Sequence, residues 1–178
     1  MELIEKTLER QPIFEGRIIK VHVDKVELPN GSTSTREIVN HPGGVGILAL
    51  DQDNNVLTVT QYRYAYQQAL LEIPAGKLER GEDPYQAALR ELKEETGAST
   101  EKLTPLGNVY PSPGFCDEII RLYLAKDLTW GEMDPDDDEF LDVQRIPFST
   151  LADQVLCGEI TDAKTCIAVL KAKLLLGL

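Results

Sequence analysis

Alternating hydrophobic and polar positions mark several short strands along the chain. In the first forty residues, Arg17 to Leu28 alternates in this way, Pro29 to Ser32 reads as a turn, and Thr33 to Val39 can return as a partner strand. This region has too few apolar residues for a core of its own, so we expect it to pack on the main domain or on another subunit. The pattern predicts a small antiparallel β-hairpin region over residues 1–43.

The remainder of the chain mixes strands with three helices. Asp83 is a suitable N-cap, Pro84 fits the first helical position, and Gly97 can end the helix in a left-handed conformation, so a helix is predicted from Pro84 to Thr96. Hydrophobic patterning predicts strands at residues 45–50, 56–62, 103–110, 119–126 and 140–146, and further helices at 150–157 and 163–176, the last one capped by Asp162. A mixed sheet between helices, of the α/β (α+β) class, is the economical arrangement.

Carboxylates gather on the first predicted helix, next to an apolar stripe whose residues recur at i, i+3, i+4 and i+7. Glu91, Glu94 and Glu95 fall within one arc beside this stripe. They repel one another unless a cation or a proton offsets their charge, and Arg90 offsets only part of it. Such oxygen ligands suit Mg²⁺ or Mn²⁺. A solvated acidic helix face is the alternative that a lone E-x-x-E-E would favour.

The residues around these glutamates decide between a metal site and a solvated acidic helix face. Gly76, Glu82 and the run from Arg90 to Ala98 follow the spacing G-x5-E-x7-R-E-U-x-E-E-x-G-U, where U is apolar and only Ala98 is a weak match. This resembles, position for position, the signature of the Nudix hydrolase superfamily. The resemblance implies a Nudix α/β/α sandwich over residues 44–178, a loop–helix–loop that holds divalent metals, and hydrolysis of a nucleoside diphosphate linked to another group.

The resemblance also implies a role for each charged residue of the motif. Arg90 would hold the carboxylates in position rather than touch the substrate. Two or three Mg²⁺ ions would neutralise the diphosphate oxygens and acidify the attacking water. The metal shell would consist of the Ala75 carbonyl with Glu91 and Glu95, assisted by Glu94 and completed or oriented by Glu82.

A second segment narrows the substrate. The loop from Tyr110 to Glu118 contains Pro113, fifteen residues after Ala98, and resembles the corresponding loop of the ADP-ribose pyrophosphatase group. Combined with Gln61 to Tyr64 and with the lead-in Ile73 to Ala75, it supports that group assignment. By itself, however, P-S-P-G is an ordinary turn sequence.

Three substrate-binding residues follow from this assignment. Arg63 would contact the diphosphate or the base, although a surface arginine at a strand edge would look the same. Glu118 would accept hydrogen bonds from the terminal ribose hydroxyls, although a carboxylate that caps backbone amides is the alternative. Ser112, in the same loop, is placed at the substrate and not as a nucleophile, because no histidine stands near it in the sequence.

The general base is expected in the acidic run before the last strand, where the group carries a glutamate on a mobile loop. This sequence has Asp137 at the aligned position and Glu139 two residues later. A shorter side chain would set the carboxylate back by roughly one carbon–carbon bond, which matters for catalytic positioning. We therefore rank Glu139 first and Asp137 second. The alternative is that the whole run only solvates the loop.

Composition limits the partners and the location. A net charge of −12 argues against nucleic acid as a partner, because such binders need Lys and Arg to replace phosphate counterions. The 3 cysteines have no metal-finger spacing, the charged N-terminus is unlike a signal peptide, and no segment resembles a membrane span. We therefore expect a cytoplasmic protein, and family resemblance suggests a homodimer paired through the N-terminal region.

The leading functional hypothesis is Mg²⁺-dependent hydrolysis of ADP-ribose to AMP and ribose 5-phosphate. Another nucleoside diphosphate sugar, such as GDP-mannose, is a close rival because the metal motif reads neither base nor sugar. A sensor that binds ADP-ribose without hydrolysing it is a third hypothesis. Such a module would be expected to have lost carboxylates of the motif, whereas Glu91, Glu94 and Glu95 are all present here.

Overall fold

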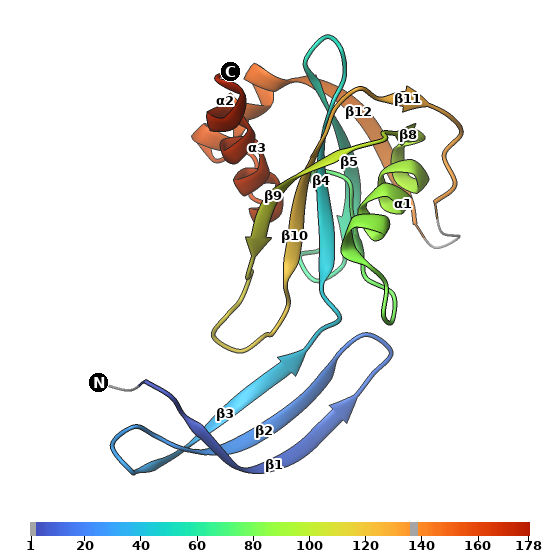
Figure 1. Ribbon diagram of the computed structural model, residues 1–178. Helices are drawn as coiled ribbons and strands as arrows, with labels where there is room; N and C mark the ends of the chain where they lie inside the picture. The colour runs from blue at the N-terminus through green and yellow to red at the C-terminus, as the bar shows by residue number, and fades with distance from the viewer. Residues whose placement is uncertain (1–2, 136–138) are drawn as a thin grey trace. The chain divides into compact units, whose positions relative to one another are not determined.

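The computed structural model describes residues 3–135 and 139–178, which fall into two compact units (Figure 1). The first unit combines the chain up to Gly43 with a later segment, Tyr110–Ile119. The second unit holds Gly44–Val109 and Ile120–Leu178. None of the helices in the described part of the chain has the length and apolar content that a bilayer crossing requires.

The first unit is built on a three-stranded antiparallel sheet of β1 (Lys6–Glu15), β2 (Lys20–Glu27) and β3 (Thr33–Asn40), with β2 in the centre. The predicted hairpin corresponds to β2 and β3. Strand β1 was not predicted. All of its residues are exposed, so no buried face imposes an alternating pattern on its sequence, and its pairing with β2 is irregular between Pro12 and Phe14.

The segment Tyr110–Ile119 is fixed to the end of β3 by backbone hydrogen bonds. The Val39 N–H donates to the Phe115 carbonyl at 2.7 Å, and the Asp117 N–H donates to the Val39 carbonyl at 3.1 Å. The Asp117 carboxylate accepts from the Asn40 side chain at 2.7 Å and from the His41 N–H at 2.8 Å. Nothing in the local sequence predicted this attachment.

The second unit contains a seven-stranded sheet, which is mixed as the sequence predicted and includes two short strands, β6 and β7, that were not predicted. Its main path runs β12-β5-β4-β10-β9, while β6 pairs with β5 and β7 pairs with β4. Only the β10–β4 pair is parallel, and the other pairs are antiparallel. The strands are β4 (Gly44–Leu50), β5 (Asn55–Arg63), β6 (Gln68–Glu72), β7 (Ala75–Lys77), β9 (Leu103–Val109), β10 (Ile120–Ala125) and β12 (Leu141–Pro147).

Helices cover both faces of this sheet, which confirms the predicted sandwich. Helix α1 (Pro84–Thr96) lies on one face, and α2 (Phe148–Cys157) and α3 (Ala163–Leu176) lie on the other (Figure 1). Strand β4 alternates between two cores: Ile47 packs in the α1 cluster and Leu48 in the α2–α3 cluster. Both faces of β4 are therefore buried, which explains its continuous apolar sequence.

The remaining strands, β8 (Ala98–Ser99) and β11 (Thr129–Trp130), form a two-stranded antiparallel ribbon. It begins directly after Gly97, at the C-terminal end of α1. The Gly131 N–H donates to the Gly97 carbonyl at 2.8 Å, and the Asp134 N–H donates to the Glu94 carbonyl at 3.0 Å. Asp134 therefore lies close to the last turn of α1.

Candidate active site

The caps of α1 fix where its carboxylates lie. The Asp83 carboxylate accepts from the Tyr85 and Gln86 N–H groups, both at 3.1 Å, and Gly97 ends the helix at φ 69°. Both predicted caps are confirmed. A Cβ at Gly97 would also lie 2.5 Å from the Gly131 carbonyl oxygen. Glycine is therefore required there both for the left-handed turn and for the close approach of the chain.

Gly76 leaves room for the carboxylate of Glu91. Residues Ala75–Lys77 of β7 pair with the start of β4 and lie against α1. A Cβ built on Gly76 would overlap the Glu91 carboxylate. Gly76 is not among the glycines with positive φ, so its backbone conformation would suit other residues. The glycine at this position of the motif is thus explained by the space that Glu91 occupies.

Arg90 bonds to three of the motif carboxylates. Its Nε and Nη2 donate to the two oxygens of Glu82, at 2.9 and 3.1 Å, and Nη1 donates to Glu94 at 2.7 Å. Nη2 also lies 2.9 Å from Glu91 Oε1. These hydrogen bonds and charges hold the pKa of Glu82 below its ordinary value, chiefly through the bond from Arg90. The position of Arg90 agrees with the structural role that the resemblance implies.

Glu91 and Glu95 are the buried carboxylates of α1, with exposures of 7% and 2%. Burial, with smaller contributions from neighbouring carboxylates, raises the pKa of Glu91 to about 7 and that of Glu95 to about 8. Glu95 also accepts a hydrogen bond from the Ala75 N–H at 2.9 Å, which opposes this rise. This bond joins Ala75 and the helix carboxylate directly, although twenty residues separate them.

Of the two candidates for the base, the structure describes Glu139. Its negative charge contributes to the raised pKa of both Glu91 and Glu95, which places it within electrostatic reach of the buried pair. Glu139 is partly buried. Asp137 lies outside the described residues.

The donor set fits a divalent cation. Two buried carboxylates whose charged forms are destabilised by desolvation would be stabilised by such an ion, and their oxygens are the ligands that Mg²⁺ and Mn²⁺ prefer. Over residues 3–135 and 139–178, no three His, Cys, Asp or Glu side chains converge as the ligands of a bound ion would. In this structure the carboxylates of Glu82 and Glu94 form ion pairs with Arg90 instead of pointing to a common metal position.

Arg63 ends β5 and is paired with a residue that sequence reasoning missed. Its Nε and Nη2 donate to the two oxygens of Glu72 at 2.7 and 2.6 Å, and Lys164 of α3 forms a second ion pair with the same carboxylate. Arg63 is therefore neither a free surface residue nor wholly buried, with 39% of its side chain exposed. The available signal was Glu72 itself, a charged residue in the otherwise apolar run Leu70 to Ala75.

Ser112 and Glu118 belong to the first unit, apart from the motif residues of the second. The Ser112 carbonyl accepts from the N–H groups of Phe115 and Cys116, at 3.2 and 2.9 Å, and so closes the turn. Glu118 Oε1 lies 3.3 Å from His41 Nδ1. The same nitrogen lies 3.1 Å from the Gly43 N–H, which donates to it.

Known proteins match both parts of this arrangement. Residues 40–165 match the family model described as NUDIX domain, and residues 5–39 match the one described as Nucleoside diphosphate sugar hydrolase N-terminal domain. A crystal structure of an ADP compounds hydrolase superposes with a TM-score of 0.87 over 99% of this chain and 97% of that one, at 23% identity. The latter match supports the fold alone.

Two curated relatives cover nearly the whole chain. The methanol dehydrogenase activator of Bacillus methanolicus is 48% identical over 93% of this chain and 90% of its own length. The ADP-ribose pyrophosphatase of Bacillus subtilis (strain 168) is 45% identical over 94% of this chain and 91% of its own length. With the complete motif from Gly76 to Ala98 on its loop and helix, the chain belongs to the Nudix hydrolase family.

Proposed function

We propose that this protein hydrolyses the diphosphate of ADP-ribose to AMP and ribose 5-phosphate, with Mg²⁺, or Mn²⁺ in its place, as the metal. The observation that carries the proposal is the pair of buried carboxylates, Glu91 and Glu95, beside Gly76 in a chain of this family. The choice of ADP-ribose is supported by the relative from Bacillus subtilis, which is named ADP-ribose pyrophosphatase.

In this proposal Glu91, Glu95 and the Ala75 carbonyl hold the metal, with Glu94 and Glu82 in support. The bound metal would offset charge on the diphosphate and lower the pKa of the attacking water. Arg90 keeps Glu82, Glu91 and Glu94 oriented through the hydrogen bonds and ion pairs described above. The Ala75 N–H holds Glu95 and thereby sets the distance between the β7 backbone and α1.

Glu139 is our first candidate for the residue that positions or deprotonates the water. Its charge acts on Glu91 and Glu95, as a base close to a water bound at those ligands would. Asp137 remains the second candidate. For the substrate, we assign Arg63 to the diphosphate or base, Glu118 to the terminal ribose hydroxyls, and Ser112 to the wall of the substrate site.

A screen of nucleoside diphosphate compounds tests the proposal. ADP-ribose, GDP-mannose and NAD are incubated with the protein and Mg²⁺, and the products are identified by chromatography. NAD is included because it carries the same ADP-ribose diphosphate. We expect AMP and ribose 5-phosphate from ADP-ribose, with kcat/KM at least about tenfold above that for the others, and no turnover in excess chelator.

Faster release of GMP and mannose 1-phosphate would favour the rival substrate. Tight binding of ADP-ribose with no product in any metal would favour the sensor. The retention of Glu91, Glu94 and Glu95 argues against the sensor.

We further propose that residues 1–43 form a dimerisation region attached to a catalytic domain at residues 44–178, in a cytoplasmic homodimer. Strand β1 exposes Leu8, Ile13 and Phe14, each more than half accessible, and pairing with a second chain would cover this apolar surface. All three cysteines are free, as a reducing compartment would keep them. Sedimentation at assay concentration is expected to give twice the mass of the chain, and a monomer would exclude this pairing.

A further inference from the structure

Four charged side chains of the second unit form a cluster in which Arg63 has a role in the proposed function, whereas Glu72, Asp162 and Lys164 have none. Glu72 is 1% exposed, accepts two hydrogen bonds from Arg63 and forms an ion pair with Lys164. Lys164 Nζ also donates to Asp162 Oδ1 at 3.0 Å. Burial alone would raise the pKa of Glu72, but the hydrogen bonds and charges of its two cations outweigh it and keep the pKa below the ordinary value. Glu72 is therefore ionised.

These residues line one side of a pocket of about 330 Å³. Two tyrosines beside it, Tyr64 and Tyr66, are among the most exposed aromatic side chains of the chain. Two cations and two anions face this pocket, so its charged wall is neutral overall. The complete lining is Arg63, Tyr64, Ala65, Tyr66, Leu70, Glu72, Asp162 and Lys164.

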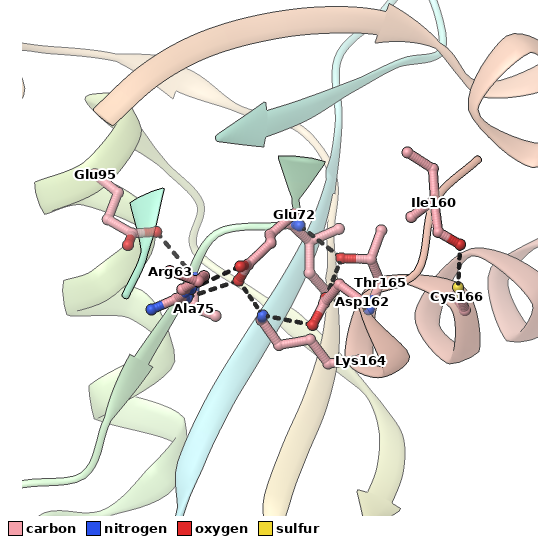
Figure 2. A network of polar contacts seen from close by, with 10 residues as sticks. Arg63, Glu72, Ala75, Glu95, Ile160, Asp162, Lys164, Thr165 and Cys166 are labelled. Atoms are coloured by element: carbon pink, nitrogen blue, oxygen red, sulfur yellow. Dashed lines mark hydrogen bonds and ion pairs between the residues drawn. The ribbon is translucent and has the colours of Figure 1, made fainter. Parts of the chain in front are cut away.

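The cluster is coupled to the metal-binding end of the sheet. Figure 2 shows Glu95 on one side of Arg63 and Glu72, with Lys164 and Asp162 on the other, and Ala75 joined to Glu95 by a hydrogen bond. The charge of Glu95 acts on Arg63, and the charge of Lys164 acts on Glu95. A diphosphate held by metal at Glu95 would therefore experience the charge of this wall.

The segment between the cluster and the metal ligand is also held in place. The Ile73 N–H donates to Thr165 Oγ1 at 2.9 Å, and the Ile47 N–H donates to the Pro74 carbonyl at 2.8 Å. Thr165 is oriented in turn by Asp162, the N-cap of α3. These hydrogen bonds hold the backbone of Ile73 and Pro74 without Lys164. Replacing Lys164 should therefore change the charge of the cluster without displacing this backbone.

Glu72 forms ion pairs with two cations, Arg63 and Lys164, although one cation would be enough to neutralise its charge. Arg63 uses Nε and Nη2 for Glu72, so Nη1 takes no part in that pair. If Arg63 were its only partner, the pair would be neutral and Asp162 would leave the wall with one net negative charge. Such a wall would oppose an approaching diphosphate. Lys164 removes that charge.

We propose that Lys164 is a positioning residue for substrate binding: its charge offsets the net negative charge that Glu72 and Asp162 would otherwise leave beside Arg63, so that Arg63 faces a diphosphate from a wall without net negative charge. This inference rests on the proposed function, because it assumes a diphosphate substrate. It assigns Lys164 an effect on KM that does not require contact with the substrate.

A charge-balance cycle tests it. The wall carries net charge 0 in the wild type, −1 in Lys164→Met, +1 in Glu72→Gln and 0 in the double variant, by counting Arg63, Glu72, Asp162 and Lys164. We expect Lys164→Met to raise KM for ADP-ribose about tenfold, with kcat within about twofold. The double variant should return KM to within about twofold of the wild type. Added salt should reduce the effect of the single variant.

Lys171→Met is the matched control, because Lys171 lies two turns later on α3 and donates to the Leu106 carbonyl rather than to a carboxylate. Its KM should be unchanged. Thermal unfolding of all variants checks the fold. An unchanged KM in Lys164→Met would overturn the role of Lys164. A rise in KM that is as large in the double variant as in Lys164→Met would also overturn it, because loss of a merely structural lysine is not rescued by removing the opposite charge.

Binding of inorganic pyrophosphate, measured by calorimetry on the same proteins in Mg²⁺, separates this inference from the proposed function. If the wild type hydrolyses no ADP-ribose but pyrophosphate affinity still falls only in Lys164→Met, the substrate assignment fails and the role of Lys164 stands. If ADP-ribose is hydrolysed with the same KM, and pyrophosphate bound with the same affinity, in all four proteins, the role of Lys164 fails and the proposed function stands.

Discussion

Glu95→Gln is expected to lower kcat for ADP-ribose by about a thousandfold while the fold remains intact. The glutamine oxygen can still accept the hydrogen bond from the Ala75 N–H, so the link between β7 and α1 is kept. What is lost is the charge of a carboxylate that is 2% exposed and that we assign to the metal. Because burial disfavours the charged form of Glu95, a neutral amide in its place should leave the free energy of unfolding unchanged or raise it.

The measurement combines steady-state kinetics with thermal unfolding and with Mn²⁺ binding followed by electron spin resonance. Glu101→Gln is the control, because Glu101 is an exposed glutamate that follows the motif in sequence, and it should match the wild type in all three measurements. Near-normal turnover by Glu95→Gln would show that Glu95 is not a required metal ligand. Loss of turnover with full Mn²⁺ affinity would move Glu95 from metal binding to another catalytic role.

The same assay compares the two candidates for the base. Glu139→Gln should reduce kcat by about a hundredfold with Mn²⁺ binding retained, because a base acts on the water rather than on the metal. Asp137→Asn should then have a small effect. The reverse order would identify Asp137 as the base, and full activity in both would mean that the metal alone activates the water.

Gly76→Ala should abolish most of the activity without unfolding the protein. Gly76 pairs with Val45 and does not have a positive φ, so alanine suits the backbone. The added methyl group would nevertheless overlap the carboxylate of Glu91, which must rotate away because backbone holds Gly76 in the sheet. Displacement of one metal ligand should reduce kcat/KM by about a hundredfold or more.

Gly131→Ala provides the comparison, since the nearest atom to its added methyl group, the Gly97 carbonyl oxygen, would lie at an ordinary 3.7 Å. Its activity and its melting temperature should be close to those of the wild type. Full activity in Gly76→Ala would show that the Glu91 carboxylate can leave its place without consequence, and so is not a required ligand.

Features set by neighbouring residues could be predicted from the sequence. Asp83, Gly97 and Asp162 act through bonds within one helical turn, and all three caps are found where they were expected. The central strands could be predicted because burial between two helical layers leaves a continuous apolar run, as in β4. The Nudix motif could also be recognised in the sequence, because its residues are close together on one loop and one helix.

Features that depend on distant pairing could not be predicted in this way. Glu72 and Lys164 are 92 residues apart, and neither carries a local mark of its partner. Strand β1 lacks a buried face, and Phe115 joins β3 by backbone bonds that any sequence could make. The candidate metal ligands could therefore be proposed from the sequence, whereas the charge balance around Arg63 required the three-dimensional structure.

The attachment of Tyr110–Ile119 to β3 has a consequence for dissecting this protein. The segment is inserted between β9 and β10, both strands of the second unit, so the chain passes between the units at three points: after Gly43, after Val109 and after Ile119. Deleting the first 43 residues would strip Phe115 and Asp117 of their backbone partners on Val39. The N-terminal strands are thus a template for a loop that lies, in sequence, between two strands of the second unit, and the two units cannot be exchanged between relatives by a single cut.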